Sequence, residues 1–182
     1  EAIRLDPNDA RAFLNRSGVY HQKKEYDRVV ADCSEAIRLN PALAVAFHNR
    51  GSAYRAKGDT NRAIADFTEA IRLEPGFANA FFSRGNLYEL NGDFDRAVAE
   101  YNEAIRLDPN DARAVLTRGG VHFQKKEYDR ALADCSEAIR LDPALARAFH
   151  TRGSAYRAKG DTNQAIADFT EAIRLEPGFA NA

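Results

Sequence analysis

The sequence predicts an all-α fold of stacked antiparallel helix pairs, and three observations lead to it. The stretch Glu-Ala-Ile-Arg-Leu, followed by Asp, Asn or Glu and then Pro, occurs six times, and neighbouring copies start 34 residues apart without insertions. Each copy ends in a proline, which cannot continue a helix. A period of this length is typical of arrays in which each unit buries its apolar face against the next unit.

Composition narrows the class of function. The chain has 26 Lys and Arg against 27 Asp and Glu, a net charge of −1, so nothing in the overall charge indicates a nucleic-acid or membrane partner. The longest apolar run, residues 42–47, is far shorter than the roughly 18–20 residues of a membrane span. The chain lacks Met and begins inside the recurring stretch, which indicates a segment of a longer protein. A cytoplasmic location is favoured, because cysteines are few.

The recurring stretch also sets the predicted boundaries. We expect residues 1–182 to form a single repeat array, in which residues 1–7 end a preceding helix and residues 178–182 start a further one. The five complete units are expected at residues 8–41, 42–75, 76–109, 110–143 and 144–177.

Two breaks are predicted in each unit. The proline after the recurring stretch should end one helix and open the next. In the middle of three units, Gly-Asp pairs such as Gly58-Asp59 supply a left-handed C-cap and an N-cap. The first and fourth units have Lys24-Glu25 and Lys126-Glu127 there, which predicts a weaker cap with lysine at positive φ.

Each unit therefore holds two helices, for which residues 44–57 and 59–73 are the clearest pair. Phe47, Gly51 and Tyr54 share one face of the first helix, and Ala63, Phe67 and Ala70 share one face of the second. Small residues on both faces should let the two backbones approach closely.

This pattern resembles the tetratricopeptide repeat, in a tandem array of bacterial type, and the resemblance covers nearly the whole chain. The second unit carries it on Phe47, Gly51, Tyr54, Ala63, Phe67, Ala70 and Pro75. The resemblance implies a right-handed α-solenoid, the superhelix of this family. The first and fourth units depart from the pattern at Ser17, Val29, Cys33, Val115, His122 and Cys135, which should change local packing but not the fold.

A longer repeat lies over the shorter one. Residues 1–80 align without gaps to residues 103–182 and differ at eleven positions: 13/115, 15/117, 17/119, 20/122, 21/123, 29/131, 30/132, 40/142, 45/147, 49/151 and 62/164. A block of three units has been copied in tandem. Cys33 and Cys135 are equivalent residues of the two copies, and the stacking predicts that they are buried thiols and not a disulfide.

Five arginines precede the helix-contact position, and each has an acid sixteen residues later: Arg16/Asp32, Arg50/Asp66, Arg84/Glu100, Arg118/Asp134 and Arg152/Asp168. Folding of each helix pair should bring them together as ion pairs of the exposed kind, each contributing ~0.2–1 kcal/mol. The alternative is a ladder of arginines that binds anions.

No combination of residues indicates catalysis. The sequence has no phosphate-binding glycine loop and no paired-cysteine or His-Glu-x-x-His metal spacing, so we predict no enzyme, no cofactor and no metal site. His48 and His150 are three units apart, and a metal site requires imidazoles that converge with other ligands on one ion, so no metal site is predicted from them.

The resemblance implies that the exposed face of each first helix lines a concave groove. The predicted partner-binding residues are Arg11, Leu14, His21, Val45, His48, Ser52, Arg55, Asn79, Phe82, Asn86, Glu89, Arg113, Leu116, Phe123, Arg147, His150 and Arg157. Five arginines and one acid make this face basic, and Leu14, Phe82, Leu116 and Phe123 should offer apolar contacts. An acidic peptide is the expected ligand; alternatively, the face is simply solvated.

The sequence therefore predicts a non-catalytic scaffold that binds a protein or peptide. Two alternatives stay open. Another copy of the chain could cover the last helix pair head to tail, at Ala165, Phe169 and Ile173. The array could also be a targeting or regulatory arm of a larger enzyme.

Overall fold

The computed structural model describes residues 8–178, and all the regular structure of this part is helical. The α-helices are α2 (Ala10–Gln22), α3 (Tyr26–Leu39), α4 (Ala44–Ala56), α5 (Thr60–Leu73), α6 (Ala78–Leu90), α7 (Phe94–Leu107), α8 (Ala112–Gln124), α9 (Tyr128–Leu141), α10 (Ala146–Lys159) and α11 (Thr162–Leu175). Each of the five predicted units holds two of these helices. The helices predicted at 1–7 and beyond Gly178 lie outside the described residues.

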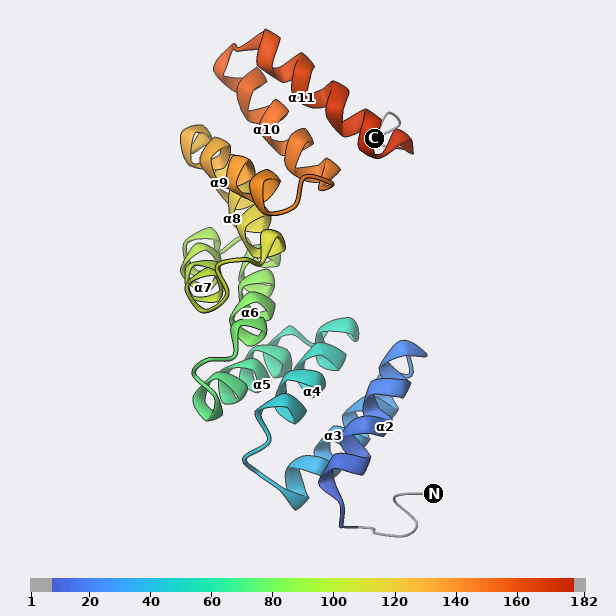
Figure 1. The fold of residues 1–182 in the computed structure, drawn as a ribbon. Helices are drawn as coiled ribbons and strands as arrows, with labels where there is room; N and C mark the ends of the chain where they lie inside the picture. Colours follow the sequence, from blue (N-terminus) through green and yellow to red (C-terminus); the bar gives the residue numbers. More distant parts are fainter. Residues whose placement is uncertain (1–7, 179–182) are drawn as a thin grey trace. The chain divides into compact units, whose positions relative to one another are not determined.

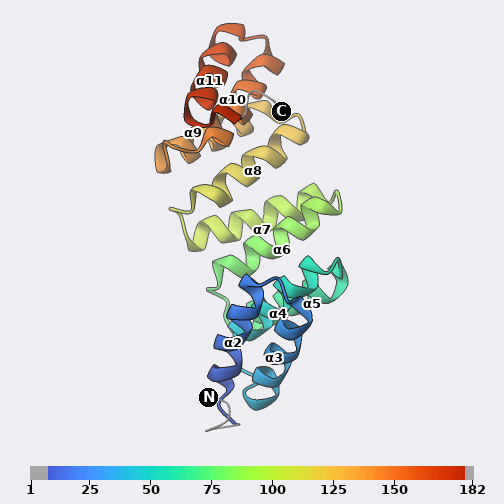
Figure 2. The same ribbon diagram turned by 90° about the vertical axis from the view of Figure 1, so that its right-hand side faces the viewer.

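The chain divides into two compact halves, residues 1–87 and 88–182, with the boundary inside α6. In the first half α2 packs along α3, α4 packs along α5, and α3 packs against α4 (Figure 1). In the second half α8 packs along α9 and α10 along α11, while α7 contacts α8 and α9 contacts α10 (Figure 2). Within each half, therefore, one helix pair packs against the next, as the repeat predicts.

The turns inside the helix pairs confirm the predicted caps. Gly58 has φ 79°, a left-handed conformation that glycine adopts without steric cost. The carboxylate of Asp59 then accepts a hydrogen bond from the backbone N–H of Arg62 at 3.1 Å, which caps α5. Lys24 and Lys126 adopt the same conformation with φ 58° and 61°, and the caps that follow them make no side-chain hydrogen bond.

The prediction that proline opens the next helix was wrong by one turn. Pro41 lies in the connecting turn, and α4 begins three residues later, at Ala44. The residue before a proline favours an extended backbone, and Asn40 has φ −143° and ψ 95°. Its side-chain oxygen accepts a hydrogen bond from the Ala42 N–H at 3.0 Å, so the turn is held before the helix starts.

The close contact inside a helix pair is clearest between α4 and α5. A Cβ atom added to Gly51 would lie 3.0 Å from the Phe67 ring and 3.2 Å from the Ala63 carbonyl oxygen, so glycine is needed for this approach. In the first pair, Ser17 faces a smaller residue, Cys33, and both are fully buried. The larger residue at one position is matched by a smaller one at the other, which explains why this departure from the repeat pattern leaves the fold intact.

Both cysteines are free and buried, as predicted. Burial raises the pKa of the Cys33 thiol to about 11 and that of the Cys135 thiol to about 12. Neither thiol is a nucleophile at neutral pH, because the thiolate is the reactive form.

Candidate functional site

Arginine–acid pairs that the spacing predicts are present in the described part of the chain. Arg50 on α4 donates two parallel hydrogen bonds to Asp66 on α5, at 2.9 and 2.8 Å. Equivalent pairs join Arg16 to Asp32, Arg118 to Asp134 and Arg152 to Asp168. The anion-ladder interpretation was wrong for these four arginines, because each is engaged by a carboxylate.

These pairs are more buried than the sequence predicted. The Asp66 side chain is 9% exposed and that of Arg50 is 20% exposed, so energies of fully exposed pairs do not apply. Hydrogen bonding to Asp66 raises the pKa of Arg50, and the guanidinium stays charged. A pair in this environment is costly to break, because one charge is left without its partner away from water.

The same arginines also reach the preceding helix pair, a contact that the sequence analysis missed. Arg50 donates from its other terminal nitrogen to Ser34 Oγ on α3 at 3.1 Å. Arg118 donates to Asn102 and Arg152 to Ser136 in the same way, and Arg84 donates to Thr68. Each of Arg50, Arg118 and Arg152 therefore connects three helices, and its role is structural.

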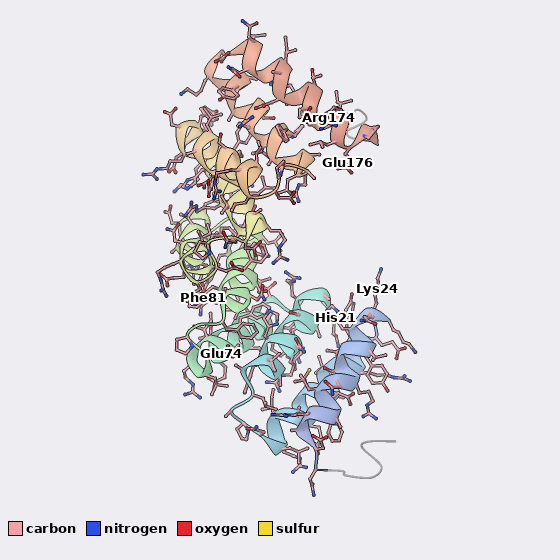
Figure 3. All side chains as sticks on the ribbon, viewed as in Figure 1. His21, Lys24, Glu74, Phe81, Arg174 and Glu176 are labelled. Atoms are coloured by element: carbon pink, nitrogen blue, oxygen red, sulfur yellow. The ribbon has the colours of Figure 1, made fainter. Side chains whose placement is uncertain are left out.

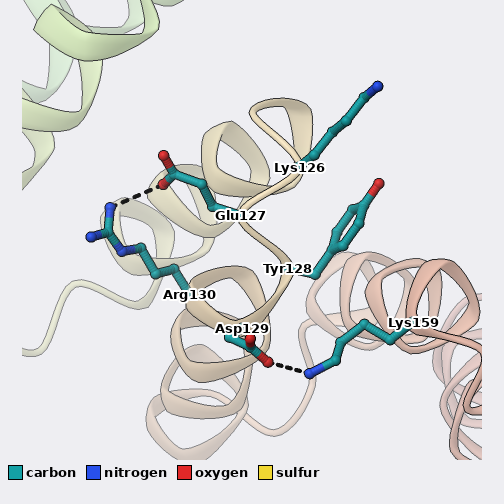
Figure 4. Close-up of a pocket in the computed structure, with 6 residues that line it drawn as sticks. All are labelled: Lys126, Glu127, Tyr128, Asp129, Arg130 and Lys159. Carbon is teal, nitrogen blue, oxygen red and sulfur yellow. Dashed lines mark hydrogen bonds and ion pairs between the residues drawn. The ribbon is translucent and has the colours of Figure 1, made fainter.

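A second set of contacts between successive pairs was also missed. The ammonium group of Lys125 forms an ion pair with Asp95 at 2.6 Å, and an equivalent pair joins Lys57 to Asp27. Figure 4 shows the third pair of this kind, Lys159 with Asp129. The two partners are thirty residues apart in each case. At the one other junction within the sequence, both equivalent positions are Asn, at 61 and 91. The acid and the lysine are thus replaced together at this junction, and this joint replacement is the sequence signal that could have revealed the pairing.

His122 belongs to a structural network and not to a reactive site. Its Nδ1 lies 2.6 Å from Glu127 Oε2, and its side chain is 7% exposed. Hydrogen bonds from His122, then from Lys125 and Arg130, lower the pKa of Glu127 to about 2. These groups surround the turn between α8 and α9 and stabilise it.

The predicted partner-binding residues fall into three classes of exposure. The exposed ones are Arg11, His21, Val45, Arg55, Asn79, Arg113, Arg147, His150 and Arg157. The half-buried ones are Leu14, His48, Ser52, Phe82, Asn86, Glu89 and Phe123, and Leu116 is buried. We call the exposed and half-buried members the groove residues.

Leu116 is a correction to the predicted site. It is 8% exposed and lies in a core cluster with Val115, Cys135 and Ala148, so it offers no apolar contact to a ligand. His48 is likewise covered in part: Phe67 and Phe77 pack on its ring, and its Nε2 lies 3.2 Å from Ser83 Oγ. The next helix pair covers this position of the first helix, and the periodicity could not show that.

Two charged groove residues are engaged within the protein. Glu89 accepts hydrogen bonds from Tyr101 at 2.7 Å and from Gln124 at 3.2 Å. Burial and the neighbouring Glu89 carboxylate raise the pKa of the Tyr101 hydroxyl, which therefore stays protonated and donates. Arg113 pairs at 2.8 Å with Asp111, the residue that caps α8.

Other groove arginines are open to solvent. Among residues 8–178, no carboxylate forms an ion pair with Arg55 or Arg157, which occupy the last turns of α4 and α10. Arg157 lies over the Phe169 ring at 5.7 Å. These two guanidinium groups keep their donors available for an external carboxylate.

A notch opens between α2 and α4 in the first half of the chain. We call it the first-repeat notch. It is lined by Ser17, Gly18, His21, Gln22, Asn49 and Ser52, together with the buried Val29 and the half-buried His48. A Cβ atom on Gly18 would meet nothing within 4 Å, which shows that the space is open. Figure 3 shows His21 at the C-terminal end of α2. None of the lining residues is acidic.

The structure was not found to hold a membrane-spanning helix or a cluster of metal-ligating side chains within residues 8–178. Within residues 8–178, every helix is too short or too polar to cross a bilayer. The same residues bring no three His, Cys, Asp or Glu side chains together in a way that could hold a metal ion.

Comparison with protein-family profiles identifies the family to which these helix pairs belong. Profiles described as tetratricopeptide repeat match residues 10–43, 48–112, 91–146 and 146–179. The chain belongs to the tetratricopeptide repeat family. This fold is a scaffold for protein interactions and is typically non-catalytic. No curated protein sequence matches the chain.

Solved tetratricopeptide repeat structures share the fold. MamA matches with a TM-score of 0.81 and 23% identity, over 91% of this chain and 97% of MamA. MamA from Desulfovibrio magneticus RS-1 matches with a TM-score of 0.83 and 21% identity, over 93% and 96% of the two chains. YrrB, described as a TPR protein with an unusual peptide-binding site, matches with a TM-score of 0.78 and 24% identity, over 97% and 91%.

Proposed function

We propose that this tetratricopeptide repeat chain is a non-catalytic scaffold that binds an acidic protein segment with its groove residues. The observation that carries the proposal is the pair of solvent-open guanidinium groups, Arg55 and Arg157, at equivalent places in the two copies of the block. Arg11 and Arg147 add further exposed positive charge on first helices. The peptide-binding site named for YrrB supports the same type of ligand, a peptide.

The chemistry favours an acidic ligand. Exposed groove residues include five arginines and no acid, while the one groove acid, Glu89, is held by Tyr101 and Gln124. Guanidinium groups bind carboxylates through paired, charge-assisted hydrogen bonds. The net charge of −1 shows that this basic character belongs to the exposed groove residues and not to the whole chain.

Replacing both Arg55 and Arg157 with Glu tests the proposal. The probe is a fluorescein-labelled peptide of sequence Ser-Gly-Glu-Glu-Leu-Glu-Glu-Gly-Ser, called the Glu peptide, and binding is measured by fluorescence anisotropy. We expect the double variant to bind it about tenfold more weakly, because in each half of the chain an attractive guanidinium group becomes a repulsive carboxylate.

The matched control replaces Arg38 and Arg140 with Glu. These arginines are also equivalent in the two blocks and change the net charge equally, but they lie on second helices and pair with Glu35 and Glu137. The control should bind the Glu peptide within about twofold of the wild type, because the groove residues are unchanged and the loss of weak surface pairs leaves the fold intact. Equal losses in both variants would show that only net charge matters and would contradict the proposal.

Self-association is a second candidate function, favoured by the end face of α11. Ile166 and Ile173 are 60% and 46% exposed, whereas the equivalent Ile64 and Ile71 on α5 are half-buried. The predicted face needs one correction, because Ala165 is 3% exposed and belongs to the core. Another copy of the chain could cover the two isoleucines.

Sedimentation velocity over a hundredfold range of concentration tests this second candidate. We expect the average mass to rise with concentration, and we expect the Ile166→Lys/Ile173→Lys variant to stay monomeric. A wild-type mass that is monomeric throughout the range would rule self-association out.

A further inference from the structure

The two copies of the three-unit block differ most at one place, the first-repeat notch. Only eleven of 80 aligned positions differ between the copies, yet four of the eight notch residues are among them: 17/119, 21/123, 29/131 and 49/151. Substitutions spread evenly would place about one there. Ser17 and Val29 are fully buried behind the recess, so His21 and Asn49 are the divergent notch residues that a ligand can reach.

The first-repeat notch carries hydrogen-bond donors and no acid. Gln22, Asn49 and Ser52 offer amide and hydroxyl donors, and His21 lies exposed at the end of α2, edge-on to the Tyr26 ring at 5.8 Å. The charge of Arg55 acts on His48 and, after burial of that ring, helps to lower the pKa of His48. Arg55 therefore brings positive charge close to the His48 side of the notch.

The acids nearest in sequence are engaged in ion pairs, among them Asp32 with Arg16 at 2.7 Å. Asp27 pairs with Lys57, and Glu25 pairs with Arg28 at 2.8 Å. An incoming carboxylate would thus meet donors and a guanidinium group without a competing negative charge. A carboxylate that receives several hydrogen bonds of this kind is strongly stabilised.

The counterpart of the notch in the second half of the chain is more apolar and already contains a carboxylate. Phe123 replaces His21 and packs against Tyr128 at 5.7 Å, and Thr151 replaces Asn49. Gln124, equivalent to Gln22, donates to Glu89, so its amide is occupied and a carboxylate is already present. A second carboxylate would be repelled there, while the exposed part of the Phe123 ring offers apolar contact.

We propose that the two copies have become different subsites. The first-repeat notch takes an acidic side chain of a bound peptide, and the counterpart around Phe123 takes an apolar one. This inference rests on the proposed function, because it assigns side-chain preferences to part of the same face. It goes further by making the two copies unequal.

Exchanging residues between the copies provides the test. The His21→Phe/Asn49→Thr variant gives the first-repeat notch the residues of its counterpart, and Phe123→His/Thr151→Asn is the reverse exchange. Each new residue already exists at the equivalent place in the chain, so the fold should tolerate it, and circular dichroism checks this. Binding is measured with the Glu peptide and with a Leu peptide, Ser-Gly-Gln-Leu-Leu-Gln-Gln-Gly-Ser.

We expect His21→Phe/Asn49→Thr to weaken binding of the Glu peptide about tenfold, because the imidazole donor of His21 is lost and the two-donor amide of Asn49 is replaced by a single hydroxyl. Binding of the Leu peptide should not weaken. The reverse exchange should leave Glu-peptide binding within about twofold of the wild type and weaken Leu-peptide binding, because it removes the apolar ring.

The outcomes separate this inference from the proposed function. If Arg55→Glu/Arg157→Glu loses the Glu peptide but His21→Phe/Asn49→Thr does not, the groove proposal stands and the unequal subsites are wrong. Equal losses of the Glu peptide in the two exchange variants would also overturn unequal subsites. A wild type that does not bind the Glu peptide would contradict both.

Discussion

Replacing Phe67 with alanine is expected to lower the free energy of unfolding by about 3–5 kcal/mol, the largest effect of any single change considered for this protein. Phe67 is fully buried, faces Gly51 across the helix pair and packs with Ala63 and Leu87. Glycine at 51 cannot move a side chain into the space, so the cavity would stay open and its cost would add to the lost burial.

Phe169 supplies the matched control for this prediction. It faces Gly153 in the same way and lies on α11, which differs from α5 at one residue, but it is only half-buried. Phe169→Ala should cost about 1–3 kcal/mol, because less apolar surface is lost from the interior. Urea titrations followed by circular dichroism measure both values. Equal costs would show that cover from α6 contributes nothing to the role of Phe67.

Replacing Asp66 with alanine is expected to cost about 2–4 kcal/mol, far more than loss of a surface ion pair. The change leaves the Arg50 guanidinium with its hydrogen bond to Ser34 but without its charged partner, at a position where its side chain is 20% exposed. Partial exposure lets water replace some of the lost contacts, so the cost stays below that of a fully buried pair.

The control for this second prediction is Glu69→Ala. Glu69 pairs with Arg72 at 2.6 Å on the surface of the same helix, and the Arg72 side chain is 66% exposed. Its removal should change stability by less than about 0.5 kcal/mol. Differential scanning calorimetry of the two variants gives the comparison, and similar melting temperatures for both would contradict the assigned role of the Arg50–Asp66 pair.

The sequence was sufficient for the presence of the helices, for the caps in the middle of each unit and for the contacts inside a helix pair. Gly58 and Lys24 were predicted at positive φ, and Arg50 was predicted to meet Asp66, because these features depend on spacing within one unit. The pattern repeats with a constant period, so local rules apply equally to each copy.

The contacts between successive pairs were harder to predict. Burial of Leu116, the Lys57–Asp27 pair and the hydrogen bond from Arg50 to Ser34 depend on how one helix pair lies against another. Periodicity identifies the face of a helix but not the part of that face that a neighbour covers. For the same reason the predicted groove contained one residue, Leu116, that the structure places in the core.

The contacts that join successive pairs also bear on how such a chain changes length. Ser34, Asp27 and the helix after them recur 102 residues later as Ser136 and Asp129, with the same partners in the following pair. Deleting residues 42–143 would bring Lys159 and Arg152 to the places that Lys57 and Arg50 hold beside Asp27 and Ser34. Whole blocks can therefore be gained or lost in evolution with the joints already matched, and selection is left to act on the few surface residues by which the blocks differ.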